Sequence, residues 1–118
     1  MKPVYSGAIT GRKKYVSDAS DAAFNEICSC LEKIGLKQLD AFQGAGIVVE
    51  RFDYPNKGFV HIEEKTRNHI GLWEISVNAT WHGREGEEED VKIIIEASYR
   101  DHGFKKAEEE VEEDREVG

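Results

Sequence analysis

The sequence predicts an α+β fold, a two-layer sandwich in which one long amphipathic helix packs on an antiparallel sheet of about five strands. One segment repeats its apolar residues at helical spacing, whereas the later segments alternate apolar with polar residues. Short connections between successive strands favour antiparallel hairpins. A sheet with one apolar face needs a single layer of helix to cover it, which completes the sandwich.

The helix is expected over 20–34, where the apolar residues share one face. That stripe consists of Phe24, Ile27, Leu31 and Ile34. Residues that favour a helix start precede it or begin it, namely Ser17, Asp18 and Ser20. Gly35 is well placed to end the helix in the left-handed region of backbone space.

The other ordered segments read as strands. Extended structure is expected over 4–10, 13–16, 36–42, 47–54, 59–66, 72–82 and 91–100. In the segment 72–82, Trp73 and Trp81 fall on the apolar face, so both are expected in the core. The segment 91–100 alternates in the same way from Val91 to Tyr99.

The end of the chain reads differently. A short helix can form from Phe104 onward, although its apolar stripe is thin. We expect one α+β domain over 1–104 and an acidic tail, helical or frayed, over 105–118.

The composition is that of a globular protein, with 39% apolar and 34% charged residues. The net charge of −8 is concentrated in Arg84–Asp90 and in the tail from Glu108. Because the rest of the chain lacks a large basic cluster, we expect no nucleic-acid binding. No apolar run suits a signal peptide or a membrane span, so we expect a cytoplasmic protein that does not enter membranes.

Metal and cofactor chemistry find little support in the sequence. Cys28 and Cys30 are two residues apart in the predicted helix, where side chains point about 200° away from each other. They cannot bridge each other there, and no second cysteine or histidine pair nearby would complete a zinc site. We therefore expect neither a metal site nor a cofactor.

Three of the four histidines lie within 61–83, which raises the question of a shared site. Pairing the predicted strands by their apolar faces places His61 opposite Glu74 or Ser76. His82 would then lie on the order of 20 Å from His61, at about 3.3 Å per residue. We therefore expect that these two histidines share no ligand.

A candidate site is instead predicted at one end of the sheet. The strand register there brings His69 close to His102, together with Arg67, Arg100 and Asp101. Histidines and charges in turns are ordinary surface residues, so a structural role ranks ahead of a functional one.

Three apolar residues fall on the polar faces of their predicted strands, namely Phe59, Leu72 and Ile94. Apolar residues on a polar sheet face can mark a contact surface. Single exposed apolar side chains are also normal on soluble proteins.

The order of elements broadly resembles the helix-grip layout of START-like lipid-binding domains, although no motif supports a family. We expect a non-enzymatic interaction module that binds a protein partner, or itself as a homodimer, through its open sheet face or acidic segments. The alternative is a carrier of a small apolar ligand between helix and sheet, lined by Phe24, Trp73, Trp81 and Tyr99. An enzyme using the histidines ranks last, because the sequence shows no catalytic set.

Overall fold

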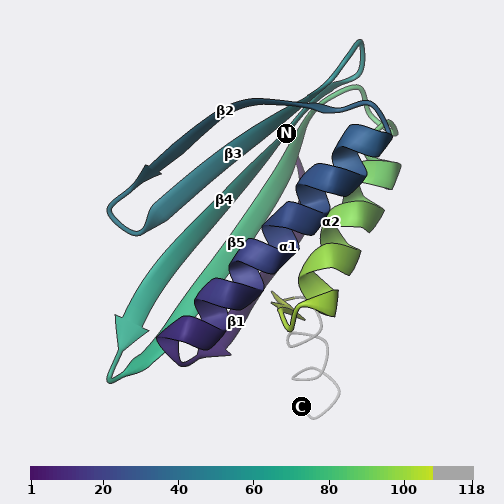
Figure 1. Cartoon of the computed structure of the whole chain (residues 1–118). Coiled ribbons are helices and arrows are strands. Elements are labelled where there is room, and N and C mark those ends of the chain that lie inside the picture. The colour runs from purple at the N-terminus through teal and green to yellow at the C-terminus, as the bar shows by residue number, and fades with distance from the viewer. Residues whose placement is uncertain (108–118) are drawn as a thin grey trace, which may run out of the picture.

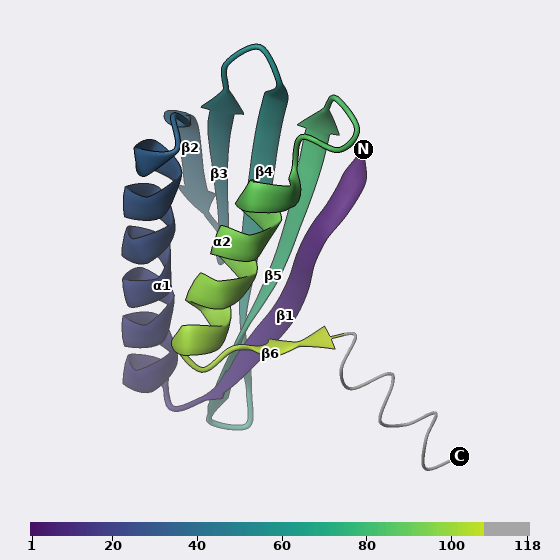
Figure 2. The ribbon, with the colours of Figure 1, turned by 90° about the vertical axis from the view of Figure 1, so that its right-hand side faces the viewer.

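The structure, a computed structural model, describes residues 1–107. The elements are β1 (Lys2–Gly11), α1 (Lys13–Lys33), β2 (Lys37–Gly44), β3 (Ile47–Tyr54), β4 (Gly58–His69), β5 (Leu72–Gly83), α2 (Glu89–Asp101) and β6 (Lys105–Lys106). The six strands form one antiparallel sheet in the order β2-β3-β4-β5-β1-β6. Both helices cover the same face, and no described element covers the other, which we call the open face (Figures 1 and 2).

This architecture confirms the predicted α+β sandwich, with six strands where about five were expected and with a shorter second helix. The short β6 pairs with β1 at one edge of the sheet, so residues placed in the predicted tail join the sheet. The predicted helix of the tail lies largely outside the described residues. None of the described helices is long and apolar enough to span a membrane.

Helix α1 begins two turns earlier than predicted, so the expected extended segment 13–16 is wrong. Val16 and Ser20 are buried and continue the stripe formed by Ala23, Ile27 and Leu31. The proposed caps therefore lie inside the helix. Its C-terminal end is as predicted, because Gly35 has a φ of +101° and the N–H of Leu36 bonds back to the carbonyl of Leu31.

The predicted strand 91–100 is wrong, because this segment forms α2. Its buried residues follow helical spacing, namely Val91, Ile95, Ser98 and Tyr99. Ile93, which the alternation placed in the core, is 65% exposed. Two acidic residues in the first turn and Arg100 in the last turn complement the helix dipole. These terminal charges indicate a helix, whereas the run of β-branched residues between them favours a strand.

The register of β4 and β5 also differs from the prediction. The strands meet at a two-residue turn in which Ile70 and Gly71 both have positive φ, as a type I′ hairpin requires. Because β4 continues to His69 rather than ending near Thr66, Val60 pairs with Trp81. This shift changes which side chains of β4 and β5 are neighbours on the open face.

The core lies between the sheet and the two helices. Trp81 is fully buried, and its indole N–H donates to the carbonyl of Arg84 over 3.0 Å, whereas Trp73 is half-buried at the core's edge. The ring of Tyr99 stacks on that of Tyr5 with centroids 5.3 Å apart. The side chains expected to surround an apolar ligand are thus packed within the core or against it.

Candidate functional site

Three adjacent strands bring a group of polar side chains together on the open face. Arg51 on β3 pairs with His61 on β4, and His61 pairs in turn with Thr80 on β5. In the next row Phe59 pairs with His82. Since paired residues in neighbouring strands point to the same face, these five side chains form one surface.

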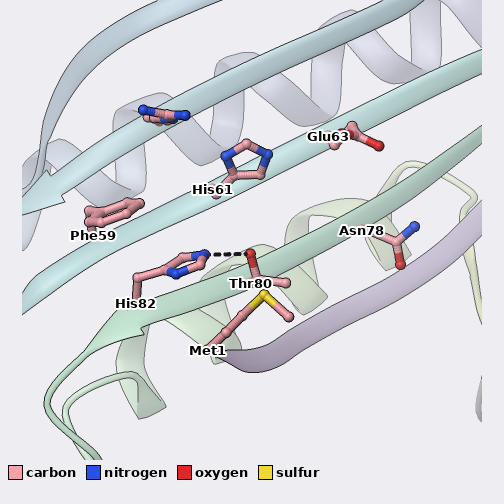
Figure 3. A pocket seen from close by; sticks show the side chains of 8 residues that line it. Met1, Phe59, His61, Glu63, Asn78, Thr80 and His82 are labelled. Atoms are coloured by element: carbon pink, nitrogen blue, oxygen red, sulfur yellow. Dashed lines mark hydrogen bonds between the residues drawn. The ribbon is translucent and has the colours of Figure 1, made fainter.

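These side chains border a hollow of about 420 Å³ on the open face (Figure 3). Its lining residues are Met1, Arg51, Phe59, His61, Glu63, Asn78, Thr80 and His82. We call it the histidine hollow.

The two histidines of this hollow are neighbours, so the expected separation on the order of 20 Å is wrong. The ring centroids of His61 and His82 are 6.5 Å apart. The ring of Phe59 stacks on that of His82 at 4.7 Å, and the hydroxyl of Thr80 shares a hydrogen bond of 3.2 Å with Nε2 of His82. Stacking and hydrogen bonding together orient the imidazole of His82 in the hollow (Figure 3).

The electrostatics of the hollow are dominated by positive groups. The pKa of His82 is lowered, first by partial desolvation and then by the positive charges of the amino terminus, His61 and Arg51. Among residues 1–107, no carboxylate lies within 4.0 Å of the Arg51 guanidinium. Glu63, the carboxylate in the hollow, is paired with Lys65 at 3.5 Å. The site therefore holds basic groups that residues 1–107 leave without an ion-pair partner.

A second, smaller hollow of about 250 Å³ adjoins the first and shares Arg51 and His61 with it. Its remaining lining residues are Asp40, Phe42 and Val49. Phe42 is 61% exposed, although it is a large aromatic residue. The basic groups are thus flanked on both sides by apolar side chains.

The predicted contact residues do not form one surface. Phe59 lines the histidine hollow, but Leu72 lies on the open face at the far end of the β4–β5 hairpin. Ile94 packs against the core from α2, so its predicted place on a polar sheet face is wrong.

The predicted pair of histidines is separated by the sheet. His69 pairs with Leu72 and borders a hollow on the open face. His102 follows α2 on the helix side, where Nε2 lies 3.7 Å from a carboxylate oxygen of Glu26. Arg100, near the end of α2, is within 3.7 Å of Asp101. The end-of-sheet site is therefore split between the two faces.

A polar cluster that sequence reasoning missed lies on the helix side. The carboxylate of Glu64 accepts hydrogen bonds from Tyr99 at 3.0 Å and from Ser20 at 3.1 Å. Burial raises the pKa of Glu64, and burial also raises that of Glu50, which accepts a hydrogen bond from Gln38 at 2.7 Å. The sequence contained a signal for this burial, because Glu64 falls in the alternating series of β4 positions whose apolar side chains face the core.

Metal binding gains no support within the described part of the chain, where no three histidine, cysteine, aspartate or glutamate side chains gather into a metal-binding group. The chain matches no protein-family model, and no curated protein or solved structure is significantly similar to it. The chemistry of the open face is therefore the basis for a functional proposal.

Proposed function

We propose that this protein is a non-enzymatic interaction module whose open sheet face binds an acidic segment of a protein partner. The observation that carries the proposal is the guanidinium of Arg51, which stands on the open face without a carboxylate partner in residues 1–107. Two histidines adjoin it. A carboxylate from a partner would supply the missing counter-charge.

The surroundings of Arg51 suit a peptide that also carries apolar residues. Phe42 and Val49 lie on one side of the basic group, and Phe59 lies on the other. Aromatic residues and arginine are the side chains enriched at the centres of protein interfaces. We therefore expect the partner segment to combine acidic with aliphatic or aromatic residues.

Binding fits this hollow better than covalent catalysis. Thr80 and His82 form a hydroxyl–imidazole pair, but desolvation and then the surrounding positive charges lower the pKa of His82 and make it a weaker base. Within residues 1–107, no carboxylate is hydrogen-bonded to the His82 ring, whereas a catalytic triad uses such a group to orient its histidine.

A peptide-display selection tests the proposal. Random peptides are selected on the wild-type protein and then rescreened on Arg51→Glu and on Arg67→Glu. Arg67 is the matched control, because it also lies on the open face but is already paired with Glu74 at 3.2 Å. We expect selected peptides that are acidic and partly apolar, that lose binding to Arg51→Glu and that retain binding to Arg67→Glu.

Two results would overturn the proposal. One is a set of peptides without acidic residues, or with equal binding to wild type and Arg51→Glu. The other is a dimer in sedimentation equilibrium that Phe42→Asp dissociates, because the open face would then be occupied by a second copy of the chain.

A further inference from the structure

We infer that the histidine hollow is a binding site for a tetrahedral oxyanion of the phosphate class. This inference rests on the proposed function, since it assigns the chemical group that the open face recognises. The hollow gathers hydrogen-bond donors from three strands on one concave surface (Figure 3). Those donors are the guanidinium of Arg51, the rings of His61 and His82, the hydroxyl of Thr80 and the amide of Asn78.

The number and spacing of the donors favour phosphate over a carboxylate. A carboxylate presents two oxygens on one edge, whereas a phosphate group presents three strongly accepting oxygens in different directions. The rings of His61 and His82 are 6.5 Å apart and inclined at 71°. Hydrogen bonds of about 2.8 Å from each ring would reach different oxygens of one tetrahedral group.

The hollow also has the size for such a group. Its volume of about 420 Å³ is many times the roughly 30 Å³ that one water occupies in the liquid. A phosphate together with the atoms that carry it therefore fits. The ring of Phe59 borders the hollow and offers an apolar wall beside the basic groups.

The charges that face His82 favour an anion. Positive charge comes from the amino terminus, from His61 on β4 and from Arg51 on β3. The opposing carboxylate in the hollow belongs to Glu63, which forms an ion pair with Lys65 at 3.5 Å. Asp53 lies in the same strand row as Phe59 and His82, and Asp40 borders the neighbouring hollow. A bound dianion would relieve the repulsion among the basic groups.

Titration with inorganic sulfate and inorganic phosphate tests this inference, followed by amide signals in proton–nitrogen NMR spectra at low ionic strength. Sulfate keeps its charge through neutral pH, so its pH dependence reports on the protein. We expect saturable shifts centred on residues 51, 61, 80 and 82, with tighter sulfate binding at about pH 6 than at about pH 8. Arg51→Gln is expected to bind roughly tenfold more weakly, as loss of one charge-assisted contact implies. Arg67→Gln, the matched control, is expected to bind like wild type.

Two further probes distinguish a phosphorylated protein segment from free phosphate as the source of the bound group. A phosphoserine peptide and the same peptide with serine are titrated under identical conditions. Saturable binding of the phosphopeptide and of inorganic phosphate, each weakened by Arg51→Gln, supports the site. Tighter binding of the phosphopeptide identifies a phosphorylated protein segment as the source, and equal affinity identifies free phosphate.

Shifts that do not saturate, or that persist equally in Arg51→Gln, overturn the inference. The two proposals also fail in different ways. Carboxylate peptides that bind through Arg51 while phosphate does not would retain the proposed function and overturn the phosphate site. Phosphate binding without any peptide binding would retain the site and overturn the proposed partner. Thermal unfolding of each variant serves as the control for an intact fold.

Discussion

The hydroxyl of Tyr99 on α2 donates a hydrogen bond of 3.0 Å to the carboxylate of Glu64 on β4. Ser20 on α1 donates to the same carboxylate, so one acidic group connects both helices to the sheet. A buried carboxylate costs free energy unless its oxygens are satisfied. These bonds therefore orient the two helices as well as compensate the burial of Glu64.

Replacing Glu64 should change how stability depends on pH. Burial raises the pKa of Glu64, so the folded protein holds this proton more tightly than the unfolded chain does. The stabilising contribution is complete below the unfolded pKa of about 4.5 and is lost as pH rises through the folded pKa. We expect the unfolding free energy of wild type to fall relative to that of Glu64→Gln over this window, as measured by urea unfolding at several pH values.

The pKa of Glu88 is shifted in the opposite direction from that of Glu64, and Glu88 is present in both wild type and Glu64→Gln. Its pKa is lowered, first by the hydrogen bond from Lys2, so its contribution is lost as pH falls. Taking the difference between wild type and Glu64→Gln cancels this effect. Parallel pH profiles for the two proteins would contradict the assignment of the slope to Glu64.

The Tyr99–Glu64 bond should appear as a coupling energy. In a double-mutant cycle of Tyr99→Phe and Glu64→Gln, we expect a coupling of about 1 to 3 kcal/mol at neutral pH, as for hydrogen bonds to charged groups. Urea unfolding of the four proteins gives this value. Additive effects within about 0.5 kcal/mol would mean that the bond contributes nothing specific.

His82 should titrate below the ordinary histidine range, because desolvation and neighbouring positive charges lower its pKa. We expect this pKa to rise in Arg51→Gln, since one of those charges is removed. Proton NMR of the imidazole signals measures the pKa of His82 in wild type and in Arg51→Gln. An unchanged His82 pKa in Arg51→Gln would show that the two side chains do not interact.

The thiol of Cys28 should be slow to react. Burial, together with the charges of Glu50 and Glu32, raises its pKa to about 11. In Cys30→Ser, where Cys28 is the remaining cysteine, we expect alkylation by iodoacetamide to stay slow at about pH 8 and to accelerate only near pH 11. Mass spectrometry of quenched samples gives the rates. An acceleration centred near pH 8.5 instead, about that of a free thiol, would contradict the burial argument.

The close approach of two strands requires Gly58. Its φ is +151°, and a Cβ there would lie 2.4 Å from the carbonyl oxygen of His82. We expect Gly58→Ala to lower the unfolding free energy by more than about 2 kcal/mol, because both backbone strain and a steric clash are introduced. Gly35→Ala is the control, since it shares the positive φ but has no atom within 4 Å of the added Cβ. Equal losses in the two variants would indicate backbone strain alone.

The open-face site could be predicted only in part. Phe59 was identified from its parity, which depends on its own strand alone. The pairing of His61 with Thr80 instead depends on where the hairpin turns. The turn has Ile70 at its first position, where asparagine, aspartate or glycine is usual. The more polar segment 67–69 therefore looked like the better turn in the sequence. The assembly of Arg51, His61 and His82 therefore followed only from the observed register.

The sequence by itself determined the α+β class, the body and C-terminal end of α1, the bounds of β3 and the burial of Trp81. Each depends on a periodic pattern or a local backbone requirement within one segment. Tertiary structure decided between helix and strand for the segment 91–100, because its apolar residues from Val91 to Tyr99 satisfy both periods. It also decided which strand residues face each other and that Tyr99 and Ser20 donate to Glu64, since these contacts join segments that are far apart in the sequence.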